Sequence, residues 1–366
     1  MRDPPSVSRT IGEEALLKLR DAGHASEVLD ARLQYAEANQ VLTHYLTPLS
    51  TVARVYPTML PTQRSGRWST TDPNLPGMSA RCINPDHEAR PEHAAERAPC
   101  WSLRDCVVPD IGTKWVGFDW EAIEAKIVSA YCKDEEDLEA FRNRWDIHSI
   151  TARKMYGWPR IPFEPTKANV FGEVGAVWRS GLGVEYTEAC RPRRLAKNAR
   201  YALGYGESER AMDRYAAEMG MSVGAMREAG HRYLNSKPLL VSWKSRTWAD
   251  CWRTHESRTI LGRRRRLFGK QKDVQKQGLN HKVQGSVADM MNTILRAVDE
   301  YQPNATLVYQ THDGAKWRFP RDADPLPWLQ PIVEREWDVD GTPITSTAEW
   351  KEWYAPEETT ERVMPQ

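Results

Sequence analysis

The stretch Val116-Gly-Phe-Asp-Trp-Glu-Ala-Ile-Glu-Ala-Lys-Ile-Val-Ser-Ala-Tyr131 changes its pattern halfway along. It begins inside an apolar run, TKWVGF, whose β-branched and aromatic residues predict a buried strand. The spacing typical of an amphipathic helix follows in Ile123, Ile127, Val128 and Tyr131. Asp119 lies where strand gives way to helix, and Glu124 lies about one turn later. Taken alone, the two carboxylates indicate a helix start favoured by its dipole, or side chains presented by a rigid strand end.

Composition limits the class of protein. The chain has 366 residues, 40% hydrophobic and 28% charged, with a net charge of +1 and a mean hydropathy of −0.67. It is therefore long enough for two or three packed subdomains of a soluble protein. No run approaches the roughly 20 apolar residues of a membrane span, and the start, MRDPPSVSRT, has no signal-peptide core. We expect an intracellular protein whose six scattered cysteines are reduced.

Two basic runs stand out in this nearly neutral chain, Arg191 to Arg194 and Arg263 to Arg266. They suit a phosphate-binding surface that also carries a few carboxylates, or else a solvated arginine-rich face.

The irregular segment 76–110 has possible zinc ligands in Cys82, His87, His93, Cys100 and Cys106. Their spacing lacks the close pairs typical of zinc sites, so an inserted surface loop is the favoured interpretation.

A second distinctive segment runs from Arg193 to Gly206. Its side chains recur every four residues and so line one side of a helix, in the order Arg193, Lys197, Tyr201 and Tyr205. Two cations followed by two aromatic rings match a nucleoside triphosphate lying along the helix, phosphates at one end and base at the other. The alternative is a surface helix whose last turn packs on the core.

Two further segments have polar residues at suggestive positions. Lys276, Asn280 and Gln284 are again four apart, as on a solvated helix face or a ridge that contacts nucleic acid. Residues 306–319 predict a strand, a tight turn and a second strand. Asp313 is then either a simple turn residue or a second carboxylate facing the strand that ends at Asp119.

Together, six ordered segments resemble the motifs of family A DNA polymerases, the class of bacterial DNA polymerase I and its phage relatives. The segment 66–75, GRWSTTDPNL, is similar to GRxSSxDPNL, and DWEAIE at 119–124 resembles motif A. Asp146-Ile-His148 resembles the DIH of the fingers, and 193–206 is similar to motif B. NHKVQGSVAD at 280–289 resembles NxxxQGxxAD, and His312-Asp313 the HD of motif C.

The resemblance implies an α+β fold, a right-hand polymerase whose palm is an antiparallel sheet and whose fingers are mostly helical. It divides the chain into residual thumb helices (1–60), a first part of the palm (61–134, with the inserted loop 76–110), fingers (135–258) and a second part of the palm (259–366). It implies a DNA-directed nucleotidyltransferase of replication or repair that adds dNTPs to a primer 3′-hydroxyl on template DNA, without proofreading.

The resemblance also implies residue roles. Two Mg²⁺ ions, with Mn²⁺ as a substitute, would be held by Asp119, Asp313 and the main-chain carbonyl of Trp120. Lys197 would protonate the leaving pyrophosphate. The nucleotide would contact Glu124, as the gate against a 2′-hydroxyl, and His148, Arg193, Lys197, Tyr201 and Tyr205. Primer-template DNA would contact Arg67, Lys276, Asn280, Gln284 and His312.

Several positions depart from the family pattern. Gly314 stands where an accessory acidic residue is usual, Lys276 where arginine is usual, and Tyr201 where phenylalanine is commoner. Most of the thumb has no counterpart, so we expect weak DNA binding unless a separate protein supplies processivity or exonuclease activity. Two alternatives remain open: a catalytically inactive or weak nucleic-acid-binding remnant of a truncated polymerase, and a phage-type single-subunit RNA polymerase.

Overall fold

A computed structural model describes residues 31–32, 35, 39, 41–78, 107–156, 186–206, 209–216 and 221–355 of the chain. The chain forms two compact units, residues 1–58 and 59–366. In the first, the described helical segment ends in a π-helical turn, η1 (Leu42–Leu46), and α3 (Thr47–Leu49). The interpretation of residues 1–60 as thumb helices, like the other domain boundaries, stays a prediction. The possible zinc ligands between Cys82 and Cys106 lie outside the described residues.

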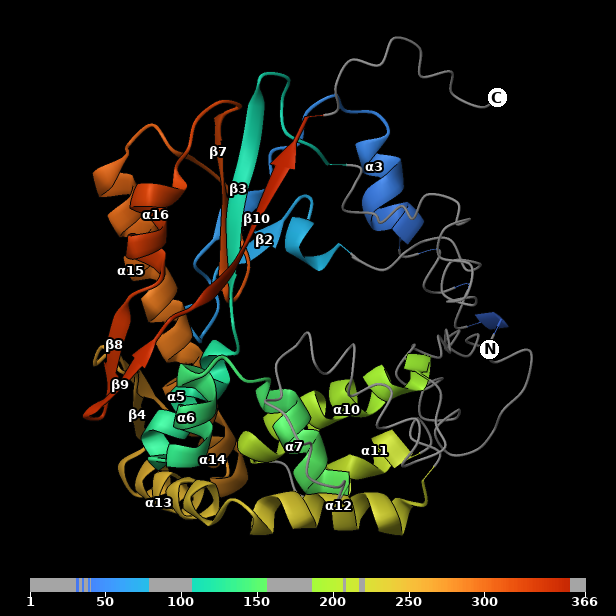
Figure 1. Ribbon diagram of the computed structural model, residues 1–366, viewed down its shortest axis with the longest axis vertical. Helices are drawn as coiled ribbons and strands as arrows, with labels where there is room; N and C mark the ends of the chain where they lie inside the picture. The colour runs from blue at the N-terminus through green and yellow to red at the C-terminus, as the bar shows by residue number, and fades with distance from the viewer. Residues whose placement is uncertain are drawn as a thin grey trace, which may run out of the picture. The chain divides into compact units, whose positions relative to one another are not determined.

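The second unit is built around a four-stranded antiparallel sheet (Figure 1). Its strands, in spatial order, are β10 (Ala348–Tyr354), β3 (Thr113–Trp120), β7 (Gly314–Pro320) and β6 (Thr306–Gln310). The predicted strand before Asp119 is confirmed as β3. The predicted hairpin at 306–319 is confirmed as β6 and β7. The mixture of helices with an antiparallel sheet confirms the α+β class.

The two faces of the sheet differ in chemistry because side chains alternate along each strand. On one face Val116, Phe118 and Trp120 of β3 are at most 5% exposed, and the ring of Phe118 stacks on Trp317 with 6.0 Å between centroids. Helices α15 (Ser286–Tyr301) and α16 (Leu326–Val333) lie on that side (Figure 1). The opposite face carries Asp119 and is open to a cleft.

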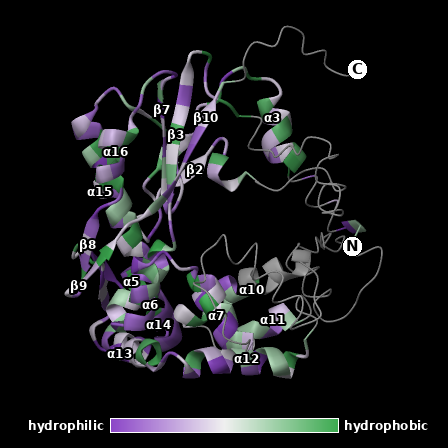
Figure 2. Cartoon of the chain, viewed as in Figure 1, coloured by the Kyte–Doolittle hydropathy of each residue, from purple (hydrophilic) through white to green (hydrophobic). Residues whose placement is uncertain are grey.

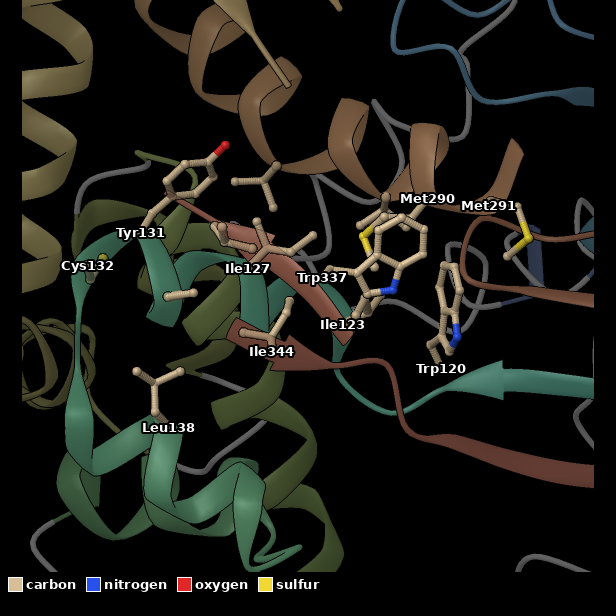
Figure 3. Packing of buried hydrophobic residues seen from close by; sticks show 14 of the residues in the cluster. Trp120, Ile123, Ile127, Tyr131, Cys132, Leu138, Met290, Met291, Trp337 and Ile344 are labelled. Carbon is tan, nitrogen blue, oxygen red and sulfur yellow. The ribbon is translucent and has the colours of Figure 1, made fainter. Parts of the chain in front are cut away.

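A left-handed turn connects β3 to helix α5 (Ile123–Cys132). Ala122 has φ +49°, a conformation that costs a residue with a side chain about 1–2 kcal/mol. Burial of the apolar side chains along one side of α5 offsets this cost. Figure 3 shows Ile123, Ile127 and Tyr131 directed toward the same core as Trp337 and Ile344, which lie on β8 (Glu336–Val339) and β9 (Thr342–Thr345). The predicted helical stripe is confirmed, and its buried face anchors the end of β3.

A group of helices follows α5. Its main members are α6 (Glu135–Arg142), α7 (Ile147–Tyr156), α10 (Tyr186–Gly204), α12 (Val223–Asn235) and α13 (Pro238–Thr254). Figure 2 shows hydrophilic and hydrophobic residues mixed along α12 and α13, as expected for helices with one face in the core. Asp146 separates α6 from α7 and caps the second helix, accepting a hydrogen bond from the Ser149 N–H at 3.2 Å.

The remaining elements are short or border the sheet. They are β1 (Thr58–Leu60), β2 (Ser69–Thr71), η2 (Leu75–Gly77), η5 (Glu209–Met212), α11 (Asp213–Ala216), β4 (Glu256–Arg258), β5 (Arg264–Arg266), α14 (Gln271–Asn280) and η6 (His281–Gly285). Strands β4 and β5 pair in an antiparallel arrangement, and β5 carries most of the basic run Arg263 to Arg266. Within the described ranges, no helix combines the length and apolar character needed to cross a bilayer.

Candidate active site

Two aspartates meet at the open face of the sheet. Asp119 lies next to the end of β3, and Asp313 lies in the turn that enters β7. The Trp120 N–H donates a hydrogen bond to the main-chain oxygen of Asp313 at 2.8 Å, and Asp119 pairs with Gly314 in the sheet register. The Asp313 carboxylate lies close enough for its charge to raise the pKa of the Asp119 carboxyl. The structure thus brings together the two residues predicted as catalytic carboxylates.

Glycine is required at the position after Asp313. A Cβ atom on Gly314 would lie only 2.3 Å from the main-chain oxygen of Phe118 and 3.3 Å from the Cα of Asp119. Both obstructing atoms belong to the backbone of β3, so they cannot rotate away as a side chain would. The absence of a side chain at Gly314 is what allows β7 to approach β3 closely beside Asp119.

The acidic pair has an unusual electrostatic environment. Partial removal from bulk water, followed in importance by the Asp313 carboxylate, raises the pKa of Asp119 to about 7. Glu349 contributes in the same direction, whereas Lys197 opposes it. A concentration of negative charge that the protein only partly compensates is suited to a cation. Carboxylate oxygens are the donors that Mg²⁺ prefers, so Asp119 and Asp313 fit a divalent metal centre.

Residues from α7 and α10 face the pair across a cleft. The cleft is lined by Asp119, Trp120, Asp313, His148, Lys197 and Tyr201. His148 is 6% exposed, and its ring centroid lies 6.0 Å from that of Tyr201. Lys197 is exposed to solvent. The structure therefore unites the predicted catalytic lysine and two predicted nucleotide contacts with the acidic pair.

Glu124 is held in place by two partners. Arg67 forms an ion pair with one of its carboxylate oxygens, and the Tyr205 hydroxyl donates a hydrogen bond to the other. Burial, and then the charge of Glu124, raises the pKa of Tyr205 well above its usual range, so its hydroxyl stays a donor. Arg67, predicted as a DNA contact, and Tyr205, predicted as a nucleotide contact, thus fix the orientation of the predicted sugar gate.

A second hollow lies beside Glu124. It is lined by Tyr201, Tyr205, Asn198, Tyr215, Lys276, Asn280 and Gln284. The three predicted DNA contacts at four-residue spacing therefore share one surface with the two tyrosines of α10. The helix that carries them changes at Asn280 from α14 into the π-turn η6, a break that the spacing did not predict.

The other predicted residues have less complete descriptions. His312 is exposed beside Asp313 and lines the cleft on the other side of the pair. Arg193 lies in α10, but its side chain is outside the described residues. Trp120 lines the cleft, and its main-chain carbonyl as a metal ligand stays a prediction.

Sequence reasoning missed Glu349 and Asn198. Glu349 lies on β10 directly opposite Asp119 and lines the cleft on both sides of the pair. Asn198 lies in the second hollow, one position after Lys197. The alternating sequence AEWKEWY could have predicted a strand at 348–354, but no local pattern tells which strand it joins.

A different acidic cluster has the geometry of a metal site without its chemistry. Oxygen atoms of Asp134, Glu136 and Asp137 lie within 4.8 Å of one another. Lys237 forms an ion pair with all three, at 2.9, 3.2 and 2.6 Å respectively, and Arg200 binds Asp137 at 2.5 Å. Lys154 also forms an ion pair with Glu136, so three cations balance the three carboxylates. The cluster is therefore a structural ion-pair network, not the predicted metal centre.

Comparisons with known proteins agree with this geometry. The family model described as DNA polymerase family A matches residues 5–174 and 176–325. The chain is 25% identical over 336 residues to the thermostable DNA polymerase I of Thermus filiformis, covering 88% of this chain and 35% of that protein. It is 24% identical over 346 residues to DNA polymerase I of Helicobacter pylori, covering 91% and 33% respectively. The chain thus spans about a third of the length of these curated relatives.

A solved structure shares the fold. The POL domain of Pol1 from M. smegmatis, in complex with DNA primer-template and dNTP, superimposes with a TM-score of 0.67 at 20% identity. The match covers 94% of this chain and 56% of that chain. With the family model matching most of the sequence, this chain belongs to the family A DNA polymerases.

Proposed function

We propose that the chain is a template-directed DNA polymerase that transfers deoxynucleotides to a primer 3′-hydroxyl. The observation that carries this proposal is the convergence of Asp119 and Asp313 with Lys197, His148 and Tyr201 in one cleft. The solved relative was captured with primer-template and dNTP, which supports the same two partners here. Two carboxylates, a cation and an aromatic ring in one cleft suit a substrate with a charged triphosphate and a planar base.

The chemistry would follow from these positions. The primer 3′-hydroxyl loses its proton to water, its oxygen attacks the α-phosphorus of the dNTP, the α–β phosphoanhydride bond breaks, and pyrophosphate leaves. Divalent cations held by Asp119 and Asp313 would lower the pKa of the hydroxyl and neutralise the developing negative charge. Lys197 and His148 would hold the phosphates, and Lys197 would supply a proton to the pyrophosphate. Tyr201 and Tyr205 would bound the space for the sugar and base.

Primer extension tests the proposal. Purified protein is incubated with Mg²⁺, a primer-template and either four dNTPs or four rNTPs, with Asp119→Asn protein as a control for contaminating polymerases. Extension with dNTPs that the variant lacks supports the proposal. Extension only with rNTPs would indicate an RNA polymerase, and no extension with either set, in Mg²⁺ or Mn²⁺, would refute the enzymatic function.

Replacing Glu124 should weaken sugar selection. Arg67 and the Tyr205 hydroxyl hold this carboxylate beside the hollow that Tyr201 and Tyr205 line. In Glu124→Ala, space opens for a 2′-hydroxyl, and we expect the ratio of rNTP to dNTP incorporation to rise at least about tenfold. Glu124→Gln, which keeps the volume, should stay close to wild type. Equal ratios in wild type and Glu124→Ala would show that Glu124 is not the gate.

Removing the Tyr201 hydroxyl should change the use of chain terminators. Tyr201 is half-buried, and burial, then the charge of Glu124, raises the pKa of its hydroxyl. A hydroxyl here can replace the hydrogen bond that a dideoxynucleotide cannot make. A hydrogen bond to a charged group contributes about 1.5–3 kcal/mol, so Tyr201→Phe should discriminate against dideoxynucleotides at least about tenfold more. Tyr205→Phe is the matched control, and an unchanged termination ratio in Tyr201→Phe contradicts the assignment.

A further inference from the structure

The sheet register places a third carboxylate beside the acidic pair. In the antiparallel pairing of β10 with β3, Glu349 lies directly across from Asp119. Residues opposite each other in this way have side chains on the same face, with Cβ atoms about 5 Å apart. Glu349 therefore shares with Asp119 the face that is open to the cleft, far along the chain from the residues that sequence motifs single out.

Both sides of the cleft include this residue. With Asp119 and Asp313, Glu349 lines the part next to Lys197 and also the part next to His312. The negative charge of Glu349 is one cause of the raised pKa of Asp119, smaller than burial and smaller than the effect of Asp313. Glu349 is thus at the boundary between the cleft's two halves, where the two aspartates also lie.

Only one neighbour of Asp119 in the sheet has a side chain to offer. On β7 the opposite residue is Gly314, where a Cβ atom would collide with the main-chain oxygen of Phe118 at 2.3 Å. On β10 the opposite residue is Glu349. A third carboxylate can therefore reach the acidic pair across the sheet from β10, but the position on β7 is closed by the backbone.

We propose that Glu349 is a third carboxylate of the metal centre formed by Asp119 and Asp313, contacting a divalent cation directly or through its water. Hard cations take six or more oxygen ligands, and two aspartates leave most of them to be supplied by other groups. The inference rests on the proposed function for the role of the cation in catalysis. Binding of the cation itself can be measured without any turnover.

The experiment measures binding of Mn²⁺ to the nucleotide-free protein by electron paramagnetic resonance of the free ion. We expect Glu349→Gln to weaken the Asp119-dependent site about tenfold, because one charged ligand is lost. Glu352→Gln is the matched control. It removes the same charge from the same strand, but Glu352 pairs with Lys114 at 2.9 Å. Glu352 also lies opposite Val116, so its side chain is on the core face of the sheet and not on the cleft face. This control should bind Mn²⁺ within about twofold of wild type, because Glu352 and Asp119 lie on opposite faces of the sheet.

A second measurement locates the ion. With Fe²⁺ in place of Mn²⁺, ascorbate and peroxide generate hydroxyl radicals that cleave the backbone near the bound metal. Cuts around residues 119, 313 and 349 in wild type, and weaker cuts at all three in Glu349→Gln, would support the proposal. Equal Mn²⁺ affinity and equal cuts in wild type and Glu349→Gln would overturn it, provided that thermal melting shows both proteins folded.

Activity then separates this inference from the proposed function. If the chain polymerises, Glu349→Gln should need about tenfold more Mg²⁺ for half-maximal primer extension and should recover at high Mg²⁺. If no protein extends a primer but Glu349→Gln still weakens Mn²⁺ binding, the proposed function fails and the metal ligand stands. If wild type polymerises and the variant's metal affinity is unchanged, only the assignment of Glu349 fails.

Discussion

Asp119→Asn is expected to lower primer extension at least about 10³-fold while making the protein more resistant to heat. The loss follows from removing a charged ligand of the centre that would stabilise the developing charge, a contribution of several kcal/mol, and about 4 kcal/mol corresponds to that factor. The gain in heat resistance follows from the repulsion between the two carboxylates when no metal ion is bound. The charge of Asp313 raises the pKa of Asp119, and an amide at position 119 does not place a second negative charge beside Asp313.

The pH dependence of this stabilisation has a definite sign. The pKa of Asp119 is about 7 in the folded chain, above the ordinary value of 3.8. The folded state therefore favours the protonated carboxyl. The contribution of Asp119 to the stability of wild type falls as the pH rises from about 4 to about 7 and is constant at higher pH. The asparagine does not ionise. The melting temperature of the variant should thus exceed that of wild type at pH 8, and the difference should disappear near pH 4.

Melting in EDTA, so that no cation compensates the aspartates, checks this expectation. Glu352→Gln is again the control, because it removes a carboxylate of the same sheet away from the pair. A variant that melts below wild type at pH 8 would mean that Asp119 stabilises the fold. An Asp119→Asn protein that extends primers at the wild-type rate would remove Asp119 from the reaction.

Local sequence pattern predicted the elements that carry the acidic pair. The β-branched and aromatic run before Asp119 and the later helical stripe were enough to predict β3 and α5. The Asp-Gly pair predicted the turn before β7. These features depend on interactions between neighbours in the chain, which sequence periodicity records directly. The meeting of Asp119 with Asp313 was predicted only with the help of the family resemblance.

The missed features depend on long-range contacts. Glu349 lies beside Asp119 because the spatial strand order is β10-β3-β7-β6, and nothing within β10 encodes its neighbour. The ion pair of Arg67 with Glu124 joins residues 57 positions apart. The π-turn η6 shifts the helix phase between Asn280 and Gln284, where the four-residue spacing alone predicts a regular helix. Tertiary packing decides each of these features.

Lys237→Met is expected to destabilise the second unit by about 3–5 kcal/mol, the usual effect of removing one partner from a buried ion pair. The side chain of Lys237 is 2% exposed, and its Nζ contacts Asp137 at 2.6 Å and Asp134 at 2.9 Å. Methionine fills a similar volume but leaves these carboxylates poorly compensated. Arg200, which binds Asp137 at 2.5 Å, and Lys154, which pairs with Glu136, would be the remaining cations of the network.

This network also determines where α10 lies. Arg200 is on the helix that carries Lys197, Tyr201 and Tyr205, and it donates to Asp137 of α6 and, at 3.2 Å, to Thr151 of α7. Weakening the network should therefore loosen the helix that faces the acidic pair. If Lys237→Met remains folded, its affinity for dNTP should fall more than that of an equally destabilised variant altered elsewhere in the core.

The acid side of the stability curve gives a separate test. Burial alone would raise the pKa of Asp137, but Arg200 and Lys237 outweigh it and hold that pKa far below its usual range. Asp137 therefore contributes stability that is present above about pH 4 and is lost as the pH falls further. In Lys237→Met that contribution shrinks, so the variant's loss below pH 4 should be shallower than that of wild type.

Urea unfolding of four proteins decides between a buried network and an ordinary surface contact. Arg253→Met is the matched control, since Arg253 lies on α13, which begins directly after Lys237, and pairs with Asp250 at 2.6 Å while 74% exposed. It should cost less than about 1 kcal/mol. Adding Asp134→Asn to Lys237→Met should recover part of the lost stability, because one carboxylate left without its lysine partner is then replaced by a neutral amide. A Lys237→Met effect as small as that of Arg253→Met, with no recovery in the double variant, would show that this network does not hold α6 and α10 together.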